Sequence, residues 1–465
     1  MSVLEERYAS TAMKEIWSKE SKIRLEREVW IAVMKAQAKA GLSVPPKAIS
    51  EYEKVIEVVN FDSIREREEV LHHDVKARIE EFNHLAGHQF IHLGMTSRDL
   101  TENIELYQIK KSLKLVGDKS ATLLNSISQL SNKYGEIPMV ARTHNVPAQV
   151  TTLGRKFATW GEELLFSLKH LEELIVRLPL RGLKGAIGTS SDLEQLIPEN
   201  SHRVETELMT HLGFDNQLSS TSQIYSRSID LEVVSTLNQI AATPSNLAVN
   251  IRLMSGNNLV SEGFEEGQTG SSAMPHKVNP RLSERVNSLA IVLKGFLVMI
   301  NEVSGNQWNE GDVSCSAVRR IALPGSFFAI DGILDTAIHI LHSLKVNEQV
   351  IKAELDENLP LLLSSTLLMQ SVSNGVGREF AHKRIKECAI KGKADQLNGL
   401  KNTFLERVLA DTELKLDAIT INKLVQSPMQ LTGLSKDQIY EFTEKVADIL
   451  IDYPDIKSYR PINII

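Results

Sequence analysis

The chain has 465 residues, of which 42% are apolar and 24% are charged, as in ordinary soluble globular proteins. It carries 52 Lys and Arg against 59 Asp and Glu, a net charge of −7, so a surface that binds nucleic acid is not expected. Its two cysteines, Cys315 and Cys388, exclude a disulfide framework and a four-cysteine zinc site.

The N-terminal part, residues 1–97, contains charged runs such as KESKIRLERE and REREE between short apolar repeats. Such runs are typical of solvated helix faces, so this part is predicted to be a domain of shorter helices. The first ten residues, MSVLEERYAS, carry charges where a signal peptide has an apolar run. We therefore expect a cytoplasmic protein.

Histidines recur in the same part of the chain. His84, His88 and His92 lie four residues apart and would share one face of a continuous helix. Gly87 weakens that helix and no HExxH motif is present, so we expect no metal site. His73, in an HHDV segment, is either an ordinary helix residue or a functional one.

Residues 98–350 show apolar side chains at three- and four-residue spacing over long blocks, the pattern of amphipathic helices. Signs of strands are sparse. The pattern predicts an all-α fold with a long central bundle between smaller N-terminal (1–97) and C-terminal (351–465) helical domains. The predicted long helices cover about 98–133, 148–178, 228–260, 282–305 and 324–345.

Two stretches without formal charge, 233–251 and 358–377, approach the length of a membrane span. Each contains Pro together with Ser, Asn and Gln, which are costly in hydrocarbon. We expect buried helices there and no association with a membrane.

Four polar segments interrupt the helical pattern. In HLGMTSRDLTEN, residues 92–103, Thr96 and Asp99 have the spacing of a capping box, with Ser97 between them. In ARTHNVPAQVTT, residues 141–152, Arg142 and His144 precede a helix that we expect to begin near Pro147.

The third segment, GFEEGQTGSSAMPHKVNPRLSER at residues 263–285, begins with a glycine- and serine-rich loop that could close over a ligand. Asn279 and Pro280 could cap the next helix, whereas Ser271, His276 and Lys277 have no such local role. The fourth segment, QWNEGDVSCSAVRR at residues 307–320, is predicted to be one turn between helices.

These residue types suit removal of a proton beside a carboxylate, because the dianionic intermediate needs cations and N–H and O–H donors. Lys277, Asn279, Thr96 and Ser97 are groups of that kind. His144 is a natural general acid for a departing amine, since an ordinary histidine titrates near neutrality. The sequence contains neither GxxxxGK[ST] nor GxGxxG.

The segment GSSAMPHKVNP, together with RTHNVPAQ and HLGMTSRD, resembles the signature segments of the fumarase/aspartase superfamily. Within it, RYASTAMKEIWS, HHDV, AMPHK and QWNEGDVSCSAVRR are similar to the adenylosuccinate lyase family. The resemblance implies cleavage of adenylosuccinate to AMP and fumarate, and the equivalent step on the succinyl-carboxamide ribotide of purine synthesis, without metal or organic cofactor. It also implies a homotetramer whose active sites are shared between subunits.

The resemblance also implies roles for individual residues. Ser271 would be the general base, His144 the general acid, and His73 a contact near the reacting centre. Lys277, Asn279, Thr96 and Ser97 would hold the succinyl carboxylates, while Gln223 and Met274 would contact substrate. The nucleotide phosphate would be bound by Arg7, Tyr8, Ser316 and Arg320.

One departure from the family pattern concerns the fourth segment, where many relatives carry Arg and His and this chain has Gly311 and Cys315. One phosphate contact is therefore missing or supplied elsewhere. Two alternatives remain: another lyase or cycloisomerase of the superfamily, acting on argininosuccinate, fumarate or carboxymuconate, and a non-enzymatic structural relative. The first would not need a phosphate site, and the second would tolerate loss of His144, Ser271 and Lys277.

Overall fold

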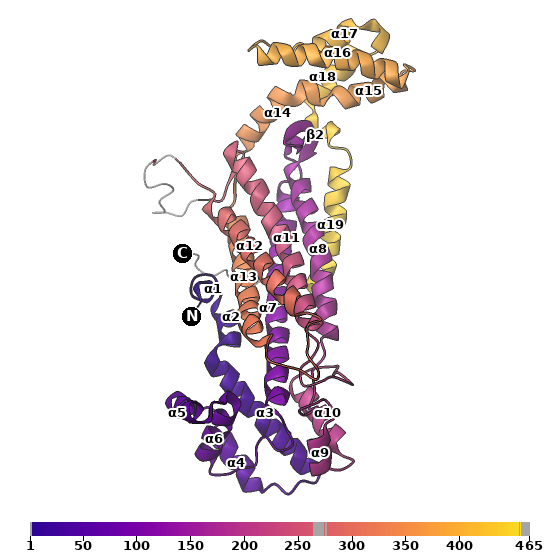
Figure 1. The fold of residues 1–465 in the computed structure, drawn as a ribbon. Coiled ribbons are helices and arrows are strands. Elements are labelled where there is room, and N and C mark those ends of the chain that lie inside the picture. Colours follow the sequence, from indigo (N-terminus) through magenta and orange to yellow (C-terminus); the bar gives the residue numbers. More distant parts are fainter. Residues whose placement is uncertain (1, 264–273, 275–276, 455, 457–465) are drawn as a thin grey trace.

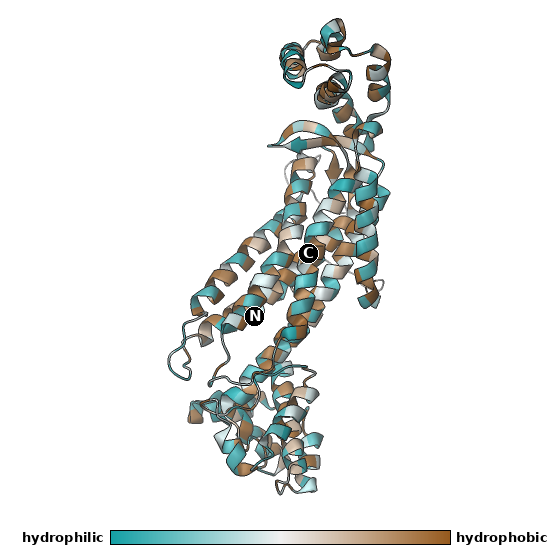
Figure 2. Cartoon of the chain, turned by 90° about the vertical axis from the view of Figure 1, so that its right-hand side faces the viewer, coloured by the Kyte–Doolittle hydropathy of each residue, from teal (hydrophilic) through white to brown (hydrophobic). Residues whose placement is uncertain are grey.

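The computed structural model describes residues 2–263, 274, 277–454 and 456, and it shows an elongated chain with a long bundle between two smaller helical ends (Figure 1). The bundle is built from α7 (Ser97–Lys133), α8 (Leu153–Arg177), α11 (Ser228–Gly256), α12 (Arg281–Val303) and α13 (Ser316–Ser343). Apolar and polar residues alternate along these helices (Figure 2), and their apolar sides form one continuous core. The predicted all-α class and central bundle are confirmed.

The lower end of the molecule in Figure 1 contains helices from two parts of the sequence. From the N-terminal part come α1 (Val3–Arg7), α2 (Thr11–Trp17), α3 (Lys19–Lys39), α4 (Pro46–Lys54), α5 (Phe61–Leu71) and α6 (Asp74–Ala86). They are joined by α9 (Ser191–Leu196) and α10 (Ser201–His211), and α10 packs on α3. The α6 helix ends at Ala86, with Gly87 in the left-handed region, so His84, His88 and His92 do not share one helix.

The upper end consists of α14 (Glu348–Leu362), α15 (Ser364–Ser373), α16 (Arg378–Leu397), α17 (Phe404–Ala410) and α18 (Ala418–Gln426). Their apolar residues form a second core, which also includes Val140 and Val150. By contrast, α19 (Ser435–Ile449) returns along α7 and α8. Gly161 permits this packing, because a Cβ there would lie 2.1 Å from Cζ of Phe442. The division at residues 97 and 350 stays a prediction, and both α10 and α19 make contacts across it.

A hairpin occupies the place where we predicted the start of a helix at 148. Strands β1 (Pro138–Thr143) and β2 (Val146–Thr152) pair antiparallel, so the prediction was wrong for residues 148–152. His144 and Asn145 both have positive φ, 53° and 63°, as a two-residue hairpin turn requires. The β-branched residues that follow favour a strand. A second short pair joins β3 (Val260–Ser261) to β4 (Lys345–Val346).

The start of α13 and the cap of α12 differ from the prediction. Helix α13 begins at Ser316 and continues through Pro324, because the surrounding helices pack tightly on this segment; residues 316–320 are thus helical and not part of a turn. Helix α12 is preceded by Pro280, and Asn279 is not its cap. The buried carboxylate of Glu262 accepts the N–H groups of Leu282 at 3.0 Å and Ser283 at 2.6 Å instead.

Both α12 and α13 are long and apolar enough, by length and composition, to cross a bilayer. The two helices differ in burial. Almost all residues of the most apolar stretch of α13 are buried, whereas only 28% of those in the corresponding stretch of α12 are buried. The stretch 233–251 lies within α11 and is largely buried, and 358–377 covers the end of α14 and all of α15.

Candidate active site

A cavity of about 730 Å³ lies where the N-terminal ends of α3, α6, α7 and α13 meet. The partial positive charge of helix N-termini makes such a convergence favourable for an anion. Its lining comprises Lys22, Glu68, His72, His73, Asp74, Val75, Ser97, Arg98, Thr101, Glu105, Gln223, Val313, Ser316, Ala317, Arg319 and Arg320.

Five residues singled out in the sequence line this cavity although they are far apart in the chain: His73, Ser97, Gln223, Ser316 and Arg320. His73 is the N-cap of α6, and its Nδ1 accepts the N–H of Lys76 at 3.3 Å. The backbone N–H of Gln223 donates to the carbonyl of Glu310 at 2.8 Å, which ties its loop to the segment before α13.

Thr96 begins α7 beside the cavity. Its N–H donates to the Asp99 carboxylate at 2.8 Å, as in the predicted capping box. The other oxygen of Asp99 accepts the N–H groups of Lys184 at 2.9 Å and Gly185 at 3.0 Å and is paired with Arg181. Asp99 therefore fixes the start of α7 to the segment before α9.

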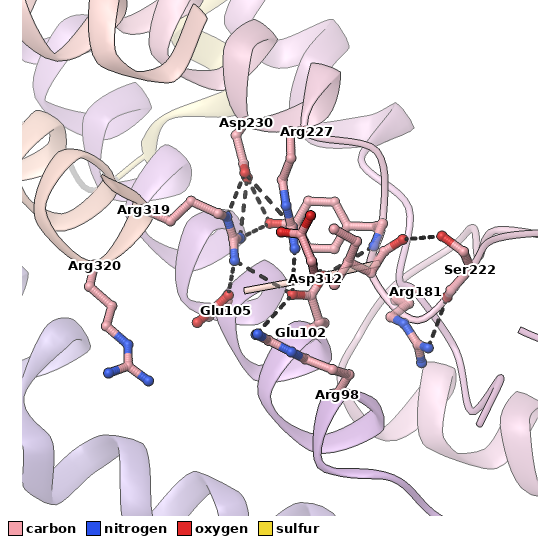
Figure 3. Close-up of polar contacts among 12 residues, drawn as sticks. Arg98, Glu102, Glu105, Arg181, Ser222, Arg227, Asp230, Asp312, Arg319 and Arg320 are labelled. Carbon is pink, nitrogen blue, oxygen red and sulfur yellow. Dashed lines mark hydrogen bonds and ion pairs between the residues drawn. The ribbon is translucent and has the colours of Figure 1, made fainter. Parts of the chain in front are cut away.

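A buried ionic network adjoins the cavity, and two of its members, Glu105 and Arg319, line it (Figure 3). Arg319 on α13 contacts Asp230 of α11 and Glu105 of α7, each at 2.7 Å. Glu102 binds Arg227 through two hydrogen bonds, at 2.8 and 3.0 Å. This network fixes α13 to α7 and α11, which holds Ser316 and Arg320 at the cavity. The sequence offered little sign of it beyond the adjacent arginines of the fourth segment.

The network also determines the charge of its carboxylates. Burial alone would raise the pKa of Glu105, but the charges of Arg319, Lys22 and Arg227 lower it to about 2. At the other wall, the pKa of Asp74 is also lowered. Burial alone would raise it, but the charge of Arg78 outweighs that effect with smaller contributions from other groups. Both acids are therefore ionised at neutral pH.

His92 lies below the cavity floor, where Trp30 donates its Nε1–H to His92 Nδ1 at 3.0 Å. Burial lowers the pKa of His92 to about 4, helped by the charges of Lys76 and His73. It is therefore a neutral hydrogen-bond acceptor at pH 7. Among the residues that the structure describes, no group of three His, Cys, Asp or Glu could hold a metal ion.

Arg7 and Tyr8 do not line this cavity and lie beside the middle of α13. The Cβ and backbone carbonyl of Tyr8 lie against Gly332, and the guanidinium of Arg285 from α12 lies 5.6 Å from the centre of the Tyr8 ring. The next segment is held by Asp331, which accepts the Ser10 N–H at 2.6 Å.

Met274, Lys277 and Asn279 precede α12, and the N–H of Lys277 donates to the Met274 carbonyl at 3.0 Å. They too are absent from the cavity lining. Ser271, the predicted base, lies outside the described residues, as does His276.

His144 is exposed at the tip of the β1–β2 hairpin, beyond the far end of α7 (Figure 1). The 37 residues of α7 separate it from the cavity, a distance of roughly 55 Å along the helix axis. Within one chain the predicted acid and the cavity are therefore at opposite ends of the bundle.

Gly311 adopts φ 140° near the cavity, and a Cβ there would lie 3.3 Å from Gln223 Cβ. An L side chain would be strained in this conformation. The backbone of this chain therefore disfavours the arginine that the family resemblance leads one to expect at this position.

Comparison of the sequence with known proteins shows the family to which the chain is similar. Residues 5–295 match the family model described as lyase, and residues 360–442 match the one described as adenylosuccinate lyase C-terminus. Adenylosuccinate lyase from Saccharomyces cerevisiae is 33% identical over 95% of this chain and 93% of that protein. The enzyme of the same name from Schistosoma mansoni is 32% identical over 98% and 96%, respectively.

Solved structures show the same fold at low sequence identity. A fumarate lyase from Mesorhizobium sp. BNC1 aligns with a TM-score of 0.81 at 20% identity, covering 94% of this chain and 98% of that chain. A 3-carboxy-cis,cis-muconate lactonizing enzyme from Pseudomonas putida gives 0.82 at 20% identity, covering 96% and 99%.

Proposed function

The chain belongs to the adenylosuccinate lyase family of the fumarase/aspartase superfamily and is a carbon–nitrogen lyase, and we propose that its cavity binds the nucleotide of adenylosuccinate. The observation that carries this proposal is the convergence of helix N-termini, Ser316 and Arg320 on one cavity. A nucleotide phosphate needs such a site, whereas argininosuccinate, fumarate and carboxymuconate do not.

The proposed reaction is a β-elimination. Ser271 removes a proton from the succinyl carbon next to a carboxylate, the C–N bond breaks, and His144 protonates the departing nitrogen. Lys277, Asn279, Thr96 and Ser97 stabilise the dianionic intermediate. The products are AMP and fumarate, and the succinyl-carboxamide ribotide reacts in the same way. The chemistry uses side chains alone, without metal or organic cofactor.

Absorbance-monitored turnover of adenylosuccinate, argininosuccinate and fumarate tests this function. Purified protein is expected to convert adenylosuccinate, and the succinyl-carboxamide ribotide, at rates within the ordinary enzyme range of about 1–10³ s⁻¹. Conversion of argininosuccinate or hydration of fumarate without conversion of adenylosuccinate would contradict it.

We further propose a cytoplasmic homotetramer in which different subunits contribute to each active site. Helix α12 exposes Ile291 (70%) and Val298 (62%), and α8 exposes Phe166, so the bundle presents apolar side chains that a partner would cover. The separation of His144 from the cavity is explained if the hairpin of one subunit reaches the cavity of another.

Mixing two inactive variants tests the shared site. His144→Gln and Ser271→Ala subunits, dissociated and reassociated together, are expected to recover about a quarter of wild-type activity, since each site receives each intact residue with a probability of one half. Each variant reassociated alone serves as the control. If mixed tetramers are verified and no activity is recovered, one subunit supplies both His144 and Ser271.

A further inference from the structure

Two cations at the cavity occupy unfavourable helix positions. Lys22 is the fourth residue of α3, and Arg98 is the second residue of α7. Positive charge at a helix N-terminus opposes the helix dipole, and acidic residues are favoured there instead. Both side chains line the cavity, so both opposing charges face the same space.

Neither cation has a close counter-ion of its own, although the charge of Lys22 acts at longer range on Glu26, Asp74 and Glu105. Arg98, with 16% of its side chain exposed, forms one ion pair, from Nη1 to Glu102 Oε1 at 3.5 Å. Glu102 is already engaged by Arg227 at 2.8 and 3.0 Å and by the Tyr225 N–H at 3.1 Å. Lys22 is partly buried and forms no ion pair or hydrogen bond with the residues that the structure describes.

Arg319 also lines the cavity, but its guanidinium is paired with Glu105 and Asp230. The lining also contains Arg320, which is 73% exposed and lies 3.9 Å from Asp74. A phosphate monoester carries about −1.5 to −2 charges at pH 7, more than one arginine neutralises. The positive φ of Gly311 disfavours an arginine at that position, and Arg7 does not line the cavity of its own chain. Within one subunit, Lys22 and Arg98 are therefore the remaining lysine and arginine of the described cavity lining that could add charge for a phosphate.

We propose that Lys22 and Arg98 bind the nucleotide phosphate together with Ser316 and Arg320, and that they replace the cation missing at Gly311. This inference rests on the proposed function of the cavity. Lys22 lies on the phosphate side, since its charge acts on both Asp74, the partner of Arg320, and Glu105. Because the charges of Lys22 and Arg98 oppose the helix dipoles, they are unfavourable in the unliganded enzyme. A bound phosphate compensates for this repulsion.

Lys22→Gln and Arg98→Gln test the assignment. Each is expected to raise the KM for adenylosuccinate and the inhibition constant of AMP in parallel, by about 10- to 100-fold, as for loss of a charged hydrogen bond. The kcat value is expected to change by less than about threefold, and inhibition by fumarate, which has no phosphate, to stay the same. The melting temperature of the unliganded variants is expected to be equal to or above that of wild type.

Arg24→Gln and Lys114→Gln are the matched controls, because Arg24 is half-buried on α3, Lys114 is exposed on α7, and neither lines the cavity. Weaker fumarate inhibition with unchanged AMP inhibition would assign the two cations to the dicarboxylate and overturn the proposal. A lower melting temperature with unchanged AMP affinity would make them structural and also overturn it. A wild-type protein inactive on adenylosuccinate would contradict the proposed function, while calorimetric titration with AMP would still decide the role of these cations.

Discussion

Ser271→Ala is expected to lower turnover of adenylosuccinate by about a thousandfold or more, with substrate still bound. A serine hydroxyl has a pKa far too high to remove a carbon-bound proton unaided. We propose that backbone N–H groups and Lys277 activate it by stabilising the alkoxide. Single-turnover kinetics at saturating substrate measure the chemical step directly.

Ser272→Ala is the matched control, since it removes the neighbouring hydroxyl from the same GSSAMPHK segment and is expected to have a milder effect. Affinity measured by calorimetry separates loss of binding from loss of chemistry. Near-normal turnover of the Ser271 variant would refute its assignment as the base.

His144→Gln is expected to reduce turnover below roughly a tenth of wild type, which corresponds to more than about 1.4 kcal/mol of activation free energy. Glutamine keeps hydrogen bonding but has no transferable proton, so substrate affinity is expected to change little. Because His144 is exposed at the tip of a hairpin, the fold is expected to survive, and circular dichroism checks this.

The positive φ of 53° at His144 calls for a second variant, His144→Asn, since asparagine tolerates the left-handed region better than glutamine. Equal loss of turnover in both variants would assign the effect to the missing proton rather than to the backbone. A variant that retained more than a tenth of wild-type turnover would place the acid elsewhere, and His73 would become the candidate.

The bundle could be predicted because apolar periodicity is a local property of the chain. The starts of α7 and α11 lie within one residue of the predicted positions 98 and 228. The start of α13 and the cap of α12 were wrong because a local signal competed with distant packing. Pro324 suggested a boundary, yet neighbouring helices stabilise α13 on both sides of it. Similarly, Asn279 had the character of a cap, but Glu262 binds the first N–H groups of α12.

The sequence by itself determined the all-α class and the types of polar group available for elimination, because both depend on residue identity over short distances. It did not show that His73, Ser97, Gln223 and Ser316 face one cavity, or that Lys22 and Arg98 join them. That arrangement depends on contacts between helices far apart in the chain, including the buried ion pairs of Arg319 with Glu105 and Asp230. Only the tertiary structure brings four helix N-termini together and places His144 at the opposite end, because helix packing, and not local periodicity, decides where each end lies.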